Sequence, residues 1–491
     1  MEAKVSFTSH KILFFNTLAF TICFAVWVFN SVLVTFLVDN GVFDWGPIEI
    51  GWLFGIPILT GSIFRLPLGI LTDKIGGRWV FGGLLLFCAI PLYFLSFANS
   101  FWSFALLGFG YGLAGSGFAV GIAFTSVWYP KEWQGRALGI VGVGNAGAAI
   151  TTLLAPTLLI KLTNNGQDME QWRVLPQLYA AALVVMAILF LIFTKNKKPE
   201  GQRTIKQMVK PLGNIRVWRF GLYYFLVFGC FVAFSQWLVP YFTNVYGVPL
   251  VVAGLFASLF SMPSGLIRAL GGWMSDKYGA RKVMEWVFKF SIGISIFLIF
   301  PKMDVFTPGK GISSTKNGVV TYVSDSKITV DETDFSLQPK VEKLIDDKKS
   351  ILPIKNSWQT PLVHEGDKVV KKQVLAQGTT HIHFSANMWI FAILAFAIGI
   401  AWGIGKAGVY KFIPDYFPED IGTVGGMVGV IGGLGGFVCP ILFGYLLEWT
   451  GFWTSCWILM LVISILCFFW LKRIVIKLLN IHAPGVTEKV E

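Results

Sequence analysis

Two stretches of this sequence repeat one set of charged residues within apolar surroundings. Residues 65–78 and 268–281 keep Arg, Gly, Asp, Lys, Gly and Arg in register, 203 positions apart (268 less 65). Each stretch closes an apolar segment long enough to span a bilayer, so Arg65 and Arg268 lie inside predicted hydrophobic helices. An arginine at the centre of such a helix costs about 2.5–3.5 kcal/mol on insertion scales and marks a functional site. The equivalent pair predicts a binding site between two repeated halves.

A pair of arginines is suited to a small oxyanion. The guanidinium is always charged and donates two parallel hydrogen bonds to adjacent oxygens. The alternative is that each arginine pairs with a carboxylate or supports the neighbouring loop. No Asp, Glu or His lies well inside a predicted helix, and an unpaired buried charge is costly. This pattern favours a ligand anion held between Arg65 and Arg268.

The charged residues that follow each arginine suit a different role. Asp73 and Arg78, like Asp276 and Arg281, fall at the predicted cytoplasmic ends of helices. We expect them to latch loops to neighbouring helix ends and to act as a gate or conformational brake.

Two further polar residues stand out inside apolar segments. Asn145 lies among glycines at the middle of its helix and can donate to an anion oxygen. Lys406 lies toward the cytoplasmic end of the tenth predicted helix. A buried lysine can exchange a proton, whereas a lysine near the interface snorkels to water. Both interpretations of Lys406 stay open.

The composition excludes a soluble protein. Hydrophobic residues make up 55% and charged residues 14%, with a mean hydropathy of +0.66. Segments long enough to cross the bilayer must be helices, because lipid offers no partner for open strands. We predict twelve, at 12–38, 48–71, 79–97, 101–127, 137–160, 175–194, 219–243, 250–274, 283–301, 386–410, 422–445 and 453–476.

The net charge of +13 follows the membrane topology. Basic residues gather in alternate loops and in the central linker, which is the positive-inside pattern. This places both termini and the linker in the cytoplasm, in an inner-membrane protein surrounded by lipid. The charge therefore does not indicate a nucleic-acid partner.

A second repeat locates an insertion. Residues 135–147 and 422–434 match at an offset of 287, which exceeds the first offset by 84, the length of residues 302–385. The chain thus reads as two equivalent halves with one insertion. The predicted parts are a six-helix half, a basic cytoplasmic linker, helices 7–9, the insertion, and helices 10–12 with a tail: 1–194, 195–218, 219–301, 302–385 and 386–491.

The insertion has the character of a soluble β-rich domain. Its residues 318–330 alternate as strands do, and turn residues punctuate it. By helix count it lies outside the cytoplasm, between helices 9 and 10. His364, His381 and His383 are candidate metal ligands. We expect ordinary surface histidines instead, and neither a metal nor a cofactor.

These features resemble the major facilitator superfamily. Twelve helices, the doubled Gly-Asp-Lys-Gly-Arg loop and the basic linker are its pattern. Arg65 and Arg268, with the glycine-rich segments 142–147 and 425–436, resemble its nitrate/nitrite porter family. The resemblance covers nearly the whole chain except 302–385. It implies an all-α membrane fold of two six-helix halves.

The resemblance also implies the site residues. In that family the two arginines bind nitrate, and the signature asparagine and glycines line the site. Carried to this sequence, the substrate-binding set is Arg65, Arg268, Asn145, Gly142, Gly144, Gly429, Tyr224, Phe228 and Phe118. The segment around Lys406 is similar to the branch that couples nitrate to protons.

The implied function is secondary transport of nitrate and nitrite, with no catalysis. Missing membrane carboxylates favour nitrate/nitrite exchange, whereas Lys406 favours proton-coupled import, which we expect. Two alternatives remain. An organic-phosphate or other anion exchanger also uses paired arginines, and a nitrate receptor would use the insertion to bind a partner.

Overall fold

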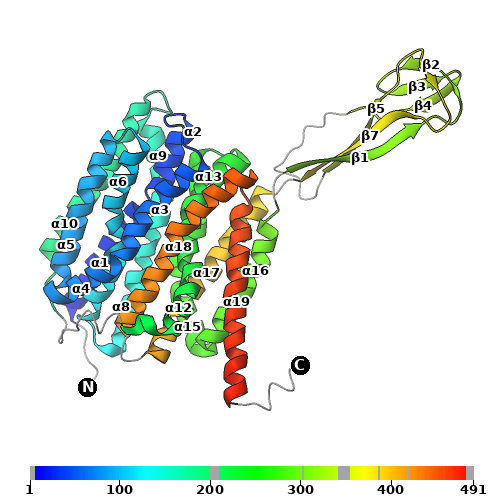
Figure 1. Ribbon diagram of the computed structural model, residues 1–491. Helices are drawn as coiled ribbons and strands as arrows, with labels where there is room; N and C mark the ends of the chain where they lie inside the picture. Colours follow the sequence, from blue (N-terminus) through cyan, green and yellow to red (C-terminus); the bar gives the residue numbers. More distant parts are fainter. Residues whose placement is uncertain are drawn as a thin grey trace. The chain divides into compact units, whose positions relative to one another are not determined.

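The computed structural model describes residues 6–198, 210–300, 303–340, 354–384, 387–417 and 421–482. The chain forms two compact units, shown in Figure 1. We call Met1–Ile299 with Ala392–Glu491 the membrane unit, and Phe300–Phe391 the β unit. The membrane unit is helical, as expected for apolar segments whose backbone groups find no partner in lipid.

Most membrane spans of the first half consist of two consecutive helices, because the span is broken near its middle. Their bounds are α1 Phe7–Trp27, α2 Asn30–Asp39, α3 Pro47–Ile63, α4 Arg65–Ile75, α5 Gly77–Phe94, α6 Phe101–Tyr111, α7 Gly117–Ser126, α8 Lys131–Gly142, α9 Gly147–Leu162 and α10 Val174–Phe193. Short 3-10 segments join α6 to α7 and α8 to α9. These joints place irregular backbone at the middle of the spans.

The second half also contains broken spans, although its last helices are continuous. Its bounds are α12 Ile215–Tyr224, α13 Phe231–Tyr246, α14 Leu250–Leu266, α15 Arg268–Tyr278, α16 Ala280–Leu298, α17 Met388–Tyr416, α18 Ile421–Thr450 and α19 Ser455–His482. A π-helical segment, Phe225–Cys230, joins α12 to α13. Such segments are rare and occur often at functional sites.

Ten spans in the described residues are long and apolar enough to cross a membrane, and an eleventh follows if α14 and α15, bent by 45°, form one span. The prediction of twelve is thus met in part. The ninth predicted segment is a helix, α16, but it carries Arg281, Lys282, Glu285 and Lys289 near its start. Glu285 pairs with Lys289 at 2.8 Å and with Lys472 of α19 at 2.9 Å.

The β unit consists of two antiparallel sheets. Their strands are β1 Met303–Ser313, β2 Gly318–Val323, β3 Lys327–Val330, β4 Thr333–Ser336, β5 Ile354–Pro361, β6 Lys368–Val369 and β7 Val374–Phe384. One sheet has the order β1-β7-β5 and the other β4-β3-β2-β6. Val320, Ile328, Val330 and Leu375 lie at the centre of its own hydrophobic core. In β3 the buried residues Ile328 and Val330 alternate with partly exposed ones, as expected of a strand with one face on a core.

Candidate functional site

Arg65 is the first residue of α4, directly after the break at Phe64. Its side chain is only 2% exposed. Nη1 donates to the carbonyl oxygen of Gly429 in α18 at 2.7 Å. Nε and Nη2 are buried and have no hydrogen-bond partner in the described part of the chain. Because a buried, unsatisfied donor is costly, these two groups are ready to bind an acceptor.

Aromatic rings enclose the Arg65 guanidinium. Its central carbon lies 5.0 Å from the ring centre of Phe228, 5.4 Å from that of Trp27 and 5.7 Å from that of Phe118. Tyr224 stacks on Phe228 at 4.9 Å with an interplanar angle of 9°. Ring faces attract a cation, so this enclosure offsets part of the loss of hydration.

Arg268 occupies the equivalent position in the second half, as the first residue of α15 after the break at Ile267. Its guanidinium carbon lies 5.7 Å from the ring centre of Phe118 and 5.3 Å from that of Tyr410. Nη1 is buried without a hydrogen-bond partner among the described residues. Both guanidinium groups therefore lie beside Phe118, and their carbons can be no farther apart than twice 5.7 Å.

The breaks before the arginines are bends in otherwise helical backbone. Phe64 and Ile267 keep right-handed helical dihedral angles, and Leu68 N–H donates to the Phe64 carbonyl oxygen, as Gly271 N–H does to that of Ile267. The arginines therefore stand at equivalent bends in the two halves.

Asn145 supplies an uncharged polar group at the same level. It lies in the 3-10 segment between α8 and α9 and is 1% exposed. Neither its amide nitrogen nor its oxygen has a hydrogen-bond partner within the described residues. In a 3-10 turn, residues three apart share a face, so Asn145 follows the face of Gly142, which lies against Arg268.

The three predicted glycines play different parts. Gly429 gives its carbonyl oxygen to Arg65. An added methyl at Gly142 would lie 3.4 Å from Arg268 Nη1. Gly144 packs against the ring of Phe20 instead, so the structure does not bring it against either arginine.

Gly429→Ala is expected to raise the Michaelis constant for nitrate uptake about tenfold, or about 1.4 kcal/mol. The new methyl would lie 3.6 Å from Arg65 Nη1 and 3.3 Å from the Tyr410 hydroxyl, and would narrow the space beside the guanidinium. Gly426→Ala on the same helix is the matched control, since its methyl would meet nothing within 4 Å. Equal kinetics in the two variants would contradict a site at Arg65.

Lys406 of α17 is fully buried. Its ammonium donates to Ser264 Oγ at 2.8 Å and lies 3.1 Å from the ring centre of Phe231. A lysine that snorkels to the interface would be exposed, so that interpretation is wrong. No carboxylate pairs with Lys406 or either arginine within the described residues.

The charged loop residues contact their own halves. Arg78 Nε donates to the carbonyl oxygen of Leu191 at the end of α10, at 3.1 Å. Asp276 pairs with Lys411 at 2.7 Å, and Arg281 donates to the Tyr416 hydroxyl at 3.3 Å. Asp73 lies half-buried in the last turn of α4. The contacts of Arg78, Asp276 and Arg281 therefore tie loops to helix ends within one half.

The two halves pack closely on the side of α3 and α14. Before Arg65 and Arg268 in the chain, α3 packs on α18, and α14 packs on α9. Glycines at which an added methyl would press against the opposite half are Gly51, Gly55, Gly254, Gly433, Gly436 and Gly444. Toward the loop motifs, methyls at Gly69, Gly139, Gly272 and Gly426 would meet nothing within 4 Å. Close contact at glycines between the halves is therefore concentrated on the side away from the loop motifs.

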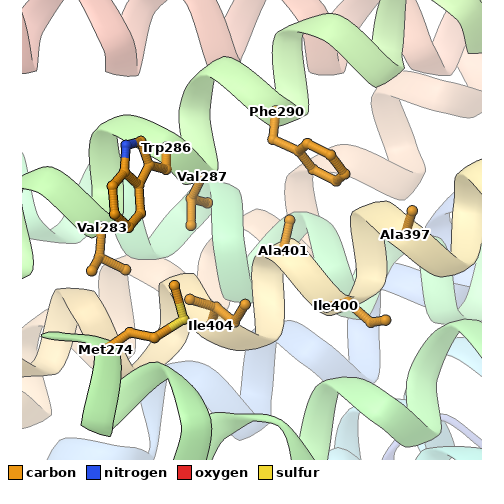
Figure 2. Close-up of a pocket in the computed structure, with 9 residues that line it drawn as sticks. All are labelled: Met274, Val283, Trp286, Val287, Phe290, Ala397, Ile400, Ala401 and Ile404. Carbon is orange, nitrogen blue, oxygen red and sulfur yellow. The ribbon is translucent and has the colours of Figure 1, made fainter. Parts of the chain in front are cut away.

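A separate apolar groove of about 340 Å³ lies among α15, α16 and α17. Figure 2 shows side chains such as Trp286 and Phe290 of α16 and Ile404 of α17 along it. Its lining has no charged residue and includes none of the predicted site residues. It offers an anion no charged partner.

Three residues of the site were not predicted from sequence. Tyr410 faces Arg268 and also donates to the carbonyl oxygen of Gly425 at 3.2 Å. Trp27 faces Arg65, and Ser264 bonds Lys406. Tyr410 stands four positions after Lys406, so one turn of helix was a usable signal. For Trp27, one of nineteen tryptophans, no comparable signal exists.

Comparisons with known proteins identify the family of this chain. The family model described as Major Facilitator Superfamily matches residues 15–326 and 374–486. A protein of Thermus thermophilus named "Probable nitrate/nitrite antiporter NarK1" is 37% identical, over 98% of this chain and 95% of its own length. The "Nitrite extrusion protein" of Bacillus subtilis (strain 168) is 25% identical, over 90% and 88%.

Other relatives extend the pattern. The "Probable nitrate transporter NarT" of Staphylococcus haemolyticus (strain JCSC1435) is 25% identical, over 92% of this chain and 94% of its own length. Among solved structures, a bacterial homologue of the human lysosomal transporter Spinster, inward-facing and occupied, superposes with a TM-score of 0.64 at 14% identity, covering 96% and 98%. The nucleoside transporter NupG gives 0.60 at 12%, covering 94% and 99%. These two structures share the fold alone. By its family model and its relatives, this chain belongs to the nitrate/nitrite porter family of the major facilitator superfamily.

Proposed function

We propose that this protein carries nitrate and nitrite across the membrane by alternating access around Arg65 and Arg268. The observation that carries the proposal is the pair of buried guanidinium groups, one from each half, with unpartnered donors beside Phe118. An oxyanion fits them because each of its oxygens accepts two hydrogen bonds or more. The names of the relatives support nitrate and nitrite as that anion.

The surroundings of the arginines support a small, flat anion. Phe118, Phe228 and Tyr410 form rigid walls near the guanidinium groups, and the amide of Asn145 offers a further donor. Glycine-rich α18 approaches Arg65 so closely that its Gly429 carbonyl takes one donor. Such close packing favours a small anion over a larger organic phosphate.

Binding couples to closure through charge. In the absence of an anion the two positive groups repel each other in a poorly hydrated space. A bound anion reduces that repulsion and lets the two halves close, which shifts the population of the two states. We assign the loop motifs to the cytoplasm by the positive-inside pattern, together with both termini, in an inner-membrane protein of twelve helices, and we take this side as the one that opens and closes. The β unit then lies between helices 9 and 10 on the opposite side.

Nitrate is expected to slow thiol labelling of Gly272→Cys from the loop-motif side several-fold. An added Cβ at this position meets nothing within 4 Å, and in the proposed cycle the halves close on this side when the anion binds. The described native cysteines are all buried and form no disulfide, so their background is low. Gly213→Cys, at an exposed loop position, is the control and should react equally with and without nitrate. Equal rates for Gly272→Cys would argue against closure on this side.

We assign the coupling proton to Lys406, which is buried and donates a hydrogen bond to Ser264. Its ammonium lies 5.8 Å from the ring centre of Phe228, the same ring that faces Arg65. A lysine so placed can give up its proton in one state and regain it in the other. Nitrate/nitrite exchange is the second candidate for the coupling mode. It is supported by the name of the Thermus thermophilus relative, which describes an antiporter.

Nitrate uptake into proteoliposomes separates these possibilities. With an inward proton gradient, empty vesicles should accumulate nitrate, and collapse of the gradient should abolish uptake. Uptake only into nitrite-loaded vesicles would instead establish exchange. Inhibition by glycerol phosphate but not by nitrite would overturn nitrate as the substrate and favour an organic-phosphate exchanger. Deletion of 302–385 without loss of flux would exclude the receptor alternative.

A further inference from the structure

The β unit contains a cluster of metal-ligating side chains at one end of its three-stranded sheet. Asp304 of β1 lies directly opposite His383 of β7 in the antiparallel register. His381 is two residues away on β7, so its side chain lies on the same face. The ligating atoms of these three residues all lie within 4.8 Å of one another.

The donors converge on one point. Asp304 Oδ1 lies 2.5 Å from His381 Nε2 and 2.6 Å from His383 Nδ1. One carboxylate oxygen and two imidazole nitrogens thus lie at a single place on the sheet.

The imidazoles are held in place while the carboxylate stays accessible. The His383 side chain is 8% exposed and that of His381 is 16% exposed, whereas Asp304 is 49% exposed. The ring of Phe306 stacks on His381 at 4.5 Å with an angle of 9°. Fixed imidazoles reduce the entropy lost on binding, and the exposed side leaves a path for an ion and for water.

We propose that Asp304, His381 and His383 bind a divalent transition-metal ion, with water completing the shell. Imidazole nitrogen with carboxylate oxygen is a donor set for Zn²⁺, Cu²⁺ or Ni²⁺ and not for Ca²⁺ or Mg²⁺. Three protein ligands with one open position also match the ligand number of open zinc sites. Binding of the ion displaces the protons that the two imidazole nitrogens share with Asp304. These protons pass to water, and the three ligand atoms then lie about 2.0–2.2 Å from the ion. The site is independent of the anion pathway.

His364 is the matched control within the same unit. Its side chain is 91% exposed, and its Nδ1 lies 3.8 Å from the carboxylate of Asp367. It is outside the cluster of three. A histidine that bound metal merely as an exposed imidazole would therefore behave like His364.

The test is Zn²⁺ titration of the full-length protein, purified without an affinity tag and stripped with chelator. Isothermal titration calorimetry should give one Zn²⁺ per chain. His381→Gln/His383→Gln should bind at least about 100-fold more weakly, whereas His364→Gln should bind like the wild type. Equal binding by the double variant, or no binding by the wild type, would overturn the site.

A spectroscopic arm does not depend on the variants folding. Co²⁺ added to the wild type should give the intense visible absorption of a four-coordinate nitrogen–oxygen site, and Zn²⁺ should abolish it. Only the weak spectrum of hydrated Co²⁺ would overturn the proposal. Nitrate uptake by the double variant should equal that of the wild type, which shows that the membrane unit is intact.

Discussion

Arg65→Lys is expected to reduce nitrate uptake at least about 100-fold, which corresponds to about 3 kcal/mol. Lysine keeps the charge, but a single ammonium cannot reproduce a planar fork that bonds the Gly429 carbonyl with Nη1 and leaves Nε and Nη2 for the anion. The shorter reach of its donors also removes contact with the ring of Phe228. Initial rates in proteoliposomes, normalised to reconstituted protein, measure the effect.

Arg268→Lys should cause a loss of similar size, because Arg268 stands at the equivalent position and faces the same Phe118. The control is Arg216→Lys, an exposed arginine that faces Tyr416 outside the site. That variant should transport at the wild-type rate. Near-normal uptake by Arg65→Lys would mean that a simple positive charge suffices and that the fork has no role.

Lys406→Gln is expected to abolish nitrate accumulation driven by a proton gradient while nitrate–nitrate exchange continues. Glutamine keeps a donor for Ser264 but cannot carry a proton. The variant therefore separates the proton from the anion. Accumulation of nitrate against its concentration gradient, measured at several values of external pH, should no longer depend on pH. The rate of counterflow of labelled nitrate should stay within about twofold of that of the wild type.

Two controls distinguish proton transfer from packing at Lys406. Ser264→Ala removes the hydrogen-bond partner but keeps the amine, so proton-driven uptake should persist. Lys289→Gln changes a lysine that is 56% exposed and paired with Glu285, and should behave like the wild type. If Lys406→Gln retained full pH-driven uptake, the assignment of the proton to Lys406 would be wrong and exchange would become the coupling mode.

The arginine pair was predictable from sequence because charge in an apolar segment is visible without a structure. Arg65 and Arg268 stand at equivalent positions in the two repeats, and Asn145 stood out as a polar residue among glycines. Phe118 and Phe228 came only from the resemblance to one family. Their mutual distances were not predictable, since they depend on packing among spans far apart in the chain. Tyr410 was overlooked for that reason, although it lies one helical turn from Lys406.

The helix breaks and the count of spans were harder to predict. A break of one residue, as at Phe64 and Ile267, leaves the apolar pattern unchanged and so gives no signal. The ninth predicted segment formed a helix, yet its charged start excludes it from the apolar spans of the described chain. Hydropathy measures composition, whereas α16 compensates its charges by pairing Glu285 with Lys289 and Lys472.

The metal-ligating cluster illustrates the limit of sequence reasoning. His381 and His383 stood out, but Asp304 lies 77 and 79 residues away. Only the antiparallel register of β1 with β7 brings them together. His364, considered together with these histidines, lies elsewhere in the unit.

Direct binding of nitrate to the purified protein tests the central claim. The claim is that one anion is held by Arg65 and Arg268 together. Isothermal titration calorimetry should give one nitrate per chain for the wild type and no measurable binding for Arg65→Lys or Arg268→Lys. Two independent nitrates per chain, or undiminished binding in either variant, would contradict a single site shared by the two halves.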